Sequence, residues 1–176
     1  MLLVIGAHHD DAELMAGGTL ARFGGEILVM TDLGFEDQKF DKYPILVLNQ
    51  KIEAKIAEYQ PDTVITHWWG DANQDHVIVN KAVNVACRPT PGHPVRRLLF
   101  GEVLSSTEWG TASFKPNYFV EIDVSKKLEM LKQYEDKMRT YPHPRSIVGI
   151  ENLAYLRATT SGLQRAEAFE VGRWID

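Results

Sequence analysis

Short apolar segments alternate with helical patterns along most of the chain. Leu2–Gly6 (LLVIG), Glu26–Met30 (EILVM) and Thr63–Thr66 (TVIT) have the length and composition of buried strands. The sequence predicts helices between them, at Ala12–Phe23 and over Ile45–Tyr59, where apolar residues recur three and four positions apart. Strands that alternate with helices indicate an α/β domain with a mainly parallel sheet.

The second half of the chain continues this alternation. Ser125 is a suitable N-cap for a helix that runs to Met138, because a serine hydroxyl can accept a backbone N–H bond. The other elements that we expect are a helix at His76–Cys87, strands at Leu98–Leu104 and Tyr118–Ile122, and a helix near residues 163–171.

The composition narrows the classes of function. A chain of 176 residues is expected to form one domain, residues 1–176. The net charge of −5, without a block of basic residues, argues against a nucleic-acid partner. The single Cys87 cannot form an internal disulfide, which fits a reducing cytoplasm. No apolar run reaches the about 20 residues that a membrane span needs, and the start lacks the features of a signal peptide.

Polar clusters follow two of the predicted strands. His8–Asp11 (HHDD) comes directly after the first strand, and the cluster at residues 67–76 (HWWGDANQDH) comes after Thr63–Thr66. Ligands of parallel sheets bind beyond the carboxyl ends of the strands. We therefore expect the two clusters to share one crevice.

The two clusters together contain the ligands of a metal site. His8, Asp11 and His76 would supply two imidazoles and one carboxylate, a recurrent set for catalytic zinc that leaves a position for water. Another divalent metal remains an alternative. Zinc would lower the pKa of that water to about 7, and Asp10 would take its proton. Asp75 would orient a ligand histidine by a hydrogen bond to the ring nitrogen that does not bind the metal.

Each cluster also has other interpretations. Asp10 and Asp11 would favour the N-terminus of the following helix as acidic residues. Paired acids after a first strand also bind magnesium in phosphorylated receiver domains, although that interpretation gives His8 and His76 no role. The pair Trp68–Trp69 suits either the core or, through Trp69, the wall of a sugar-sized pocket.

These motifs resemble those of the LmbE-like, or PIG-L, zinc-dependent N-deacetylases. AHHDDAELMAGGTL at 7–20 resembles the A-H-P-D-D-x-x motif of the family and the G-G-T-L of its following helix, and NQDH at 73–76 resembles H-x-D-H. The similarity continues in EVLSSTEW (102–109), FKPNYFVEID (114–123), YPHPRS (141–146) and AEAF (166–169). It therefore covers most of the chain.

The resemblance implies a Rossmann-like, three-layer α/β sandwich. It also implies hydrolysis of an N-acetyl group on a small amino sugar, such as N-acetylglucosamine, or a sugar conjugate. By position in the motifs, His8, Asp11 and His76 would bind zinc. Asp10 would be the general base for a zinc-bound water and would later protonate the leaving amine, while zinc stabilises the oxyanion.

Two departures from the family motifs concern single residues. His9 replaces the usual proline, and Asn73 replaces the first histidine of H-x-D-H. Asparagine can donate a hydrogen bond to a substrate carbonyl, but it cannot become an imidazolium. His143 in PHPRS is a candidate to replace that histidine, and Arg145 is a candidate anchor for a substrate carboxylate, phosphate or hydroxyl.

A third departure is a shortened segment after the second strand. EILVMTDLG runs directly into FEDQKFDKYP, so this member of the family is expected to lack one early helix, together with its substrate-binding arginine. Such a loss would expose apolar surface that a neighbouring loop or a second copy of the chain would cover. A homo-oligomer is the expectation.

The shortened segment leaves two alternatives to a sugar deacetylase. One is a protein that binds zinc with little or no turnover. The other is a metal-dependent hydrolase of a different amide or of an ester. In each case the histidines must be neutral to bind metal, so metal binding is expected to weaken below about pH 6.

Overall fold

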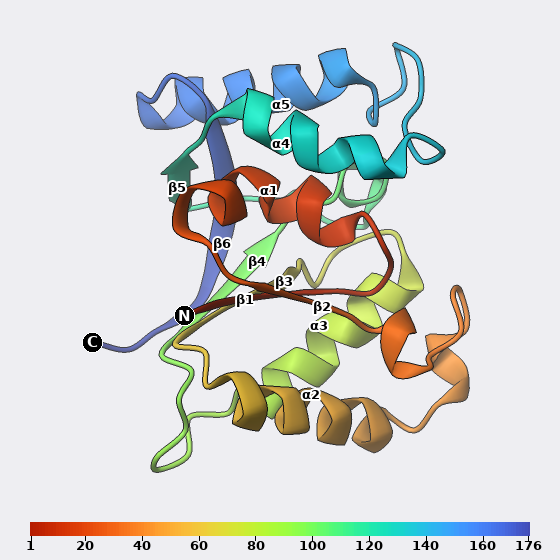
Figure 1. Cartoon of the computed structure of the whole chain (residues 1–176), viewed down its shortest axis with the longest axis vertical. Helices are drawn as coiled ribbons and strands as arrows, with labels where there is room; N and C mark the ends of the chain where they lie inside the picture. Colours follow the sequence, from red (N-terminus) through yellow and green to blue (C-terminus); the bar gives the residue numbers. More distant parts are fainter.

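A computed structural model describes all 176 residues and contains one six-stranded sheet with helices on both faces (Figure 1). The strand order is β2-β1-β3-β4-β6-β5. The first four strands of the chain pair in parallel, whereas β6 is antiparallel to both β4 and β5. The prediction of a mainly parallel α/β sandwich is confirmed. The strands are β1 (Leu2–Gly6), β2 (Glu26–Val29), β3 (Thr63–His67), β4 (Arg97–Gly101), β5 (Tyr118–Glu121) and β6 (Ala166–Trp174).

The helices form two layers. In Figure 1, α2 and α3 lie on one face of the sheet, and α1, α4 and α5 lie on the other. The side chains of β1 divide between the two layers, because Leu3 and Ile5 join the core on the α2 and α3 side and Val4 joins the other core. None of these helices combines the length and the hydropathy that a membrane-spanning segment requires. The helices are α1 (Asp11–Phe23), α2 (Ile45–Tyr59), α3 (Gln74–Ala86), α4 (Val124–Leu131) and α5 (Ile147–Ser161).

Two predictions for the second half of the chain were wrong. Residues 163–171 do not form a helix, because most of them belong to strand β6, which lies between β4 and β5. Ser125 is not the N-cap of α4. That cap is Asp123, whose Oδ1 accepts the N–H of Ser125 at 2.9 Å, and the helix ends at Leu131 rather than at Met138.

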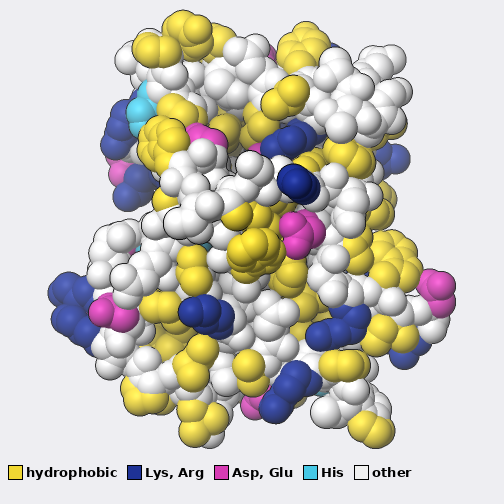
Figure 2. All heavy atoms as spheres, turned by 180° about the vertical axis from the view of Figure 1, so that it is seen from behind, with side chains coloured by type: hydrophobic (Ala, Val, Ile, Leu, Met, Phe, Trp, Pro, Cys, Tyr) yellow, Lys and Arg dark blue, Asp and Glu magenta, His cyan; other side chains and the backbone are white.

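The segment between β2 and α2 contains no α-helix. It forms two short 3₁₀ turns, η1 (Thr31–Leu33) and η2 (Phe40–Lys42). Phe35 and Phe40 from this segment are buried in the core on the α2 and α3 side. A neighbouring loop therefore covers part of the apolar surface that a missing helix would expose. Other hydrophobic side chains remain at the surface, among polar and charged ones, on the side of the molecule that Figure 2 shows.

Helix α1 is interrupted near its middle. Ala16 has a non-helical backbone (φ −140°, ψ 19°), and the buried Glu167 of β6 accepts the N–H groups of Gly18 at 2.9 Å and of Thr19 at 2.7 Å. The ammonium group of Lys127 on α4 lies 2.8 Å from the same carboxylate. This buried ion pair connects α1, α4 and β6 and fixes the helix that begins at the first polar cluster.

Candidate metal centre

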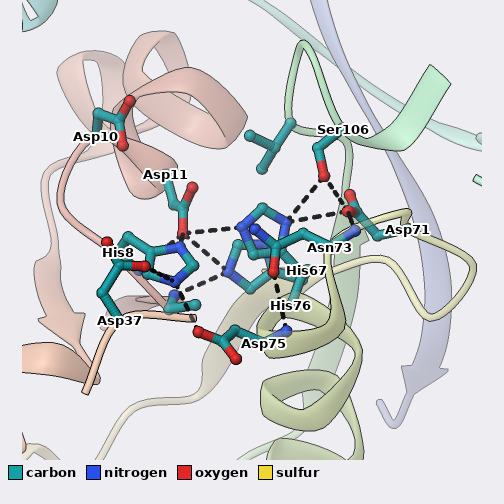
Figure 3. A network of polar contacts seen from close by, with 12 residues as sticks. His8, Asp10, Asp11, Asp37, His67, Asp71, Asn73, Asp75, His76 and Ser106 are labelled. Carbon is teal, nitrogen blue, oxygen red and sulfur yellow. Dashed lines mark hydrogen bonds and ion pairs between the residues drawn. The ribbon is translucent and has the colours of Figure 1, made fainter. Parts of the chain in front are cut away.

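The first polar cluster lies in the turn between β1 and α1. Asp10 has a left-handed backbone (φ 87°), which is uncommon for a residue other than glycine. Because of this turn, the carboxylates of Asp10 and Asp11 point in different directions (Figure 3). Asp10 makes no side-chain capping bond to α1, so capping is not its role in this structure.

The second cluster lies beside the first because β1 and β3 are paired neighbours. β3 ends at His67, and α3 begins a few residues later. Asn73 is the N-cap of α3, where its Oδ1 accepts the N–H of Asp75 at 2.9 Å. His76 follows in the first turn of the helix and points back toward the first cluster (Figure 3).

One carboxylate oxygen is the centre of this arrangement. Asp11 Oδ2 accepts the N–H of His8 at 2.8 Å and lies 3.3 Å from both His8 Nδ1 and His76 Nε2. Ligand atoms of His8, Asp11 and His76 all lie within 4.8 Å of one another. Two imidazoles and a carboxylate suit zinc and several other divalent metals. The residues that the sequence nominated as ligands therefore fit such an ion.

A carboxylate lies close to the ring of each of the two candidate ligand histidines. Asp71 Oδ1 is 3.1 Å from His76 Nδ1, and Asp75 Oδ2 is 3.0 Å from His8 Nε2. Hydroxyl groups of Ser106 and Thr107 donate to Asp71, the second at 2.6 Å. Such carboxylates fix the orientation of a ligand histidine and the nitrogen that carries its proton. The position of Asp75 beside His76 in the sequence predicts such a contact with a histidine, whereas Asp71 carries no motif signal of its own.

His67 is a buried neighbour of the ligand group. Its ring stacks on that of His76 with centroids 3.8 Å apart and an interplanar angle of 13°. Its Nε2 accepts the backbone N–H of Ala7 at 2.8 Å, and its buried Nδ1 has no hydrogen-bond partner. Burial and the nearby His76 lower the pKa of His67, so the ring is neutral and supports the end of β1.

The pKa values of His76 and Asp11 depend on each other. Burial alone would lower the pKa of His76, but Asp11 and Asp71 outweigh this effect and raise it to about 10. Burial alone would raise the pKa of Asp11, but the positive charge of the neighbouring His76 outweighs this effect and holds the pKa well below its usual range. His76 therefore carries a proton at neutral pH, and a metal ion bound at its Nε2 would have to displace this proton.

Asp10 is paired with Arg145. Arg145 Nη1 lies 2.7 Å from Asp10 Oδ2, and Arg145 Nε donates to the carbonyl of Leu104 at 3.1 Å. Burial raises the pKa of Asp10 to about 6, although Arg145 opposes the shift. His143, proposed to replace the missing histidine, accepts the N–H of Arg145 through Nδ1 at 3.1 Å.

A polar cavity of about 440 Å³ contains this group of residues. None of its lining side chains is hydrophobic. Trp69 and His143 are not among them, and the indole of Trp69 instead donates to Glu170 at 3.1 Å. The lining residues are His8, His9, Asp10, Asp11, Thr31, Asp32, Asp37, Gln38, Asn73, His76, Lys137 and Arg145.

Comparison with protein families gives one match. The PIG-L model, described as GlcNAc-PI de-N-acetylase, matches residues 26–87. This segment includes Asp75 and His76 and begins after the cluster at His8–Asp11. A search of curated proteins finds no match. The resemblance to the PIG-L family that the motifs predict is confirmed by the family match.

Solved structures share the fold over almost the whole chain. N,N'-diacetylchitobiose deacetylase from Pyrococcus horikoshii is 15% identical, with a TM-score of 0.71 over 98% of this chain and 83% of that one. The zinc-inhibited form of teicoplanin deacetylase Orf2 is 17% identical, with a TM-score of 0.71 over 99% of both chains. The 4-carboxy-2-hydroxymuconate hydratase GalB from Pseudomonas putida KT2440 is 15% identical, with a TM-score of 0.66 over 97% and 95%. The fold is therefore shared by proteins of more than one activity.

Proposed function

From its match to the PIG-L family, we propose that this chain is a metal-dependent hydrolase that removes an acetyl group from a small, polar N-acetylated compound. One observation supports this proposal most strongly. His8, Asp11 and His76 lie close together in the lining of a polar cavity, and the buried carboxylate of Asp10 lines the same cavity. Two imidazoles and a carboxylate favour zinc as the metal. An amino sugar is the substrate class that the family suggests.

The bound metal would supply a Lewis acid that lowers the pKa of a water molecule and polarises the acyl oxygen. The chain supplies the remaining functions. Asp71 and Asp75 orient the imidazoles of His76 and His8, so that each ring can present an unprotonated nitrogen. This support fixes the ligands before the substrate arrives.

Asp10 is the proposed general base. With a pKa of about 6, it is mostly ionised at neutral pH and remains close enough to that pH to return a proton. The oxygen of water would bond to the acyl carbon while Asp10 takes the proton. The carbon–nitrogen bond would then break as the proton passes to the amine nitrogen, which leaves acetate and a free amine.

Asn73 is the proposed donor to the substrate carbonyl. Its Oδ1 is occupied by the cap of α3, so its Nδ2 amide group is the part that is free to donate into the cavity. A neutral donor stabilises a developing oxyanion less than an imidazolium does. We therefore expect slow turnover rather than none.

The test combines metal content with product identity. The purified protein should contain about one equivalent of zinc or another divalent metal and should release acetate from N-acetylated sugars or amines. Asp10→Asn should reduce kcat by about 100-fold or more while the metal content is unchanged. Full activity in this variant would reject the role of Asp10, and a protein that neither contains nor binds a divalent metal would reject the whole site.

A metal-binding protein with little turnover is the second candidate. The ion pair between Asp10 and Arg145 favours it, because the pair holds the base away from the ligand group. Metal binding without acetate release from any N-acetylated sugar, N-acetylated amine or ester would support this candidate. Ester cleavage without amide cleavage would indicate a hydrolase of another bond.

A further inference from the structure

The loop after β4 lies beside the loop after β3, because these two strands are paired neighbours. The loop after β4 contains the 3₁₀ turn η3 (Thr107–Trp109). Glu108 accepts two backbone N–H groups of this loop, at 2.7 Å and 3.0 Å, so bonds within the loop fix the turn. The turn brings the buried side chain of Thr107 to the buried carboxylate of Asp71.

The hydroxyl group of Thr107 can donate in one direction only. Its Oγ1 accepts the buried N–H of Val103 at 2.8 Å, and a backbone N–H can only donate. The single hydroxyl proton therefore goes to Asp71 Oδ2, at 2.6 Å. No other group of the chain donates to this carboxylate oxygen, so Thr107 alone satisfies it.

The other oxygen of Asp71 faces His76 (Figure 3). Asp71 Oδ1 accepts the N–H of Asn73 at 2.8 Å and lies 3.1 Å from His76 Nδ1. Because every neighbour of this carboxylate donates to it, the proton between Asp71 and His76 belongs to Nδ1. The other ring nitrogen, Nε2, then faces Asp11 Oδ2 at 3.3 Å, on the side of the candidate ligands.

The hydroxyl group of Ser106 lacks this fixed direction. It also donates to Asp71 and lies 3.4 Å from His76 Nδ1, but no backbone N–H of the chain donates to it. A hydroxyl without a donor of its own can serve either partner. Thr107 is therefore the residue of this loop whose hydrogen bonds determine where the proton of His76 lies.

We propose that Thr107 is a positioning residue, which holds the proton of His76 on Nδ1 through Asp71 and so leaves Nε2 to bind the metal. The inference rests on the proposed function in one respect, because it takes His76 as a metal ligand. Thr107 does not line the cavity and supplies no ligand. The loop after β4 would thus determine the strength of a metal site that it does not touch.

The test compares two variants that keep different parts of the Thr107 side chain. Thr107→Val keeps its size and removes the hydroxyl, and Thr107→Ser keeps the hydroxyl and removes the methyl group. Competition with a chromogenic chelator measures zinc affinity, and circular dichroism measures folding. Zinc affinity should fall about tenfold in Thr107→Val and stay within about twofold of the native value in Thr107→Ser.

NMR of the zinc-loaded protein gives a second readout, which a loss of packing would not change. The proton on His76 Nδ1 should give a downfield signal that correlates with this nitrogen, in the native protein and in Thr107→Ser. In Thr107→Val the signal should move upfield or be lost through exchange with water. A native protein without a proton on His76 Nδ1 would overturn the inference, even if Thr107→Val does not fold.

Thr66→Val is the matched control, because the buried Thr66 donates its hydroxyl to the carbonyl of Ile5 at 3.0 Å and does not contact Asp71. It should keep the native zinc affinity and the native His76 signal. Equal zinc affinity in Thr107→Val and the native protein, or an equal loss in Thr107→Ser, would overturn the inference whether or not acetate is released. A tenfold loss confined to Thr107→Val, without acetate release by the native protein, would retain the inference and reject the proposed function.

Discussion

The guanidinium of Arg145 and the carboxylate of Asp10 lie 2.7 Å apart. The carboxylate of Asp11 points in a different direction from that of Asp10 (Figure 3). The two adjacent aspartates therefore have different partners: Asp10 pairs with Arg145, and Asp11 contacts His8 and His76. The left-handed backbone at Asp10 produces this separation. The ion pair also keeps the pKa of Asp10 lower than burial alone would make it, which affects the pH at which Asp10 can act as a base.

Removal of Arg145 should raise the pKa of Asp10. Burial raises that pKa to about 6 and Arg145 opposes the rise, so Arg145→Gln removes a stabiliser of the ionised form. A base must be deprotonated to act, and the acid limb of the kcat/KM profile should therefore move upward by about one pH unit. Arg139→Gln is the control, because the Arg139 guanidinium donates only to backbone carbonyls. An acid limb that does not move in Arg145→Gln would show that Arg145 does not influence the pKa of the catalytic base.

Metal binding near neutral pH should release protons. His76 has a pKa of about 10 in the metal-free chain, and the pKa of His8 is also raised, since its contacts with Asp11 outweigh burial. Affinity should therefore continue to rise well above pH 6, the limit expected for unperturbed histidines. Calorimetry in two buffers of different ionisation enthalpy measures the release directly. Identical heats in both buffers would show that His76 is already neutral.

The same proton should make the metal-free chain less stable as pH rises. The pKa of His76 is about 6.5 when unfolded and about 10 when folded, so its stabilising effect is complete below about pH 6.5. It is lost progressively as pH rises toward about 10. Thermal unfolding of the metal-free protein between these values should show a falling Tm, and His76→Asn should reduce the dependence. A Tm that rises over this range would contradict the assigned direction.

Loss of Asp71 should weaken the metal site through His76. Asp71→Asn removes the charge that faces His76 Nδ1 and leaves a side chain of the same size. Changes of this kind typically lower metal affinity by about 10- to 100-fold. Competition with a chromogenic chelator measures the change, with Asp62→Asn as a control on a carboxylate outside the cavity. An unaltered affinity would mean that packing alone orients His76.

Disruption of the buried ion pair should destabilise the whole fold. Lys127 donates to Glu167 and to the carbonyl of Leu14, both at 2.8 Å, at the interruption of α1. Lys127→Met leaves the carboxylate of Glu167 buried without a cation, at a cost of about 3–5 kcal/mol. Urea unfolding measures this free energy, and the exposed neighbour Lys126→Met should change it by less than about 0.5 kcal/mol. A small loss in Lys127→Met would show that the N–H groups of Gly18 and Thr19 stabilise the carboxylate without a cation.

The sequence predicted the candidate metal ligands because residues with metal-binding side chains lie next to segments with a clear strand pattern. His8, Asp11 and His76 could be nominated because they lie in polar clusters that follow two predicted strands of a parallel sheet. The structure brings these clusters together. Strand β6 was missed because it lies between β4 and β5, where side chains on both of its faces are buried at its start, so no alternation marks it. Helix α5 was missed because Ile147, Val148 and Leu156 are exposed and obscure its buried face.

Other features depend on tertiary contacts that no local pattern reports. Asp71 is separated from His76 by a turn, and its role requires the hydroxyl groups of Ser106 and Thr107 from another loop. The contact between Asp37 and His8 follows from how the shortened segment folds back. Sequence alone indicated that the segment was short, and it did not indicate where its side chains would lie.

The segment between β2 and α2 forms one wall of the polar cavity. Asp75 binds this wall only through the backbone N–H groups of Gln38 and Phe40. Because backbone N–H groups are present in every residue except proline, substitutions on this wall need not loosen its attachment. Evolution could therefore change the side chains that meet an incoming compound while the metal ligands remain untouched. The side chains of this segment can therefore vary, and with them the compounds that the cavity accepts, while the positions of the candidate metal ligands stay the same.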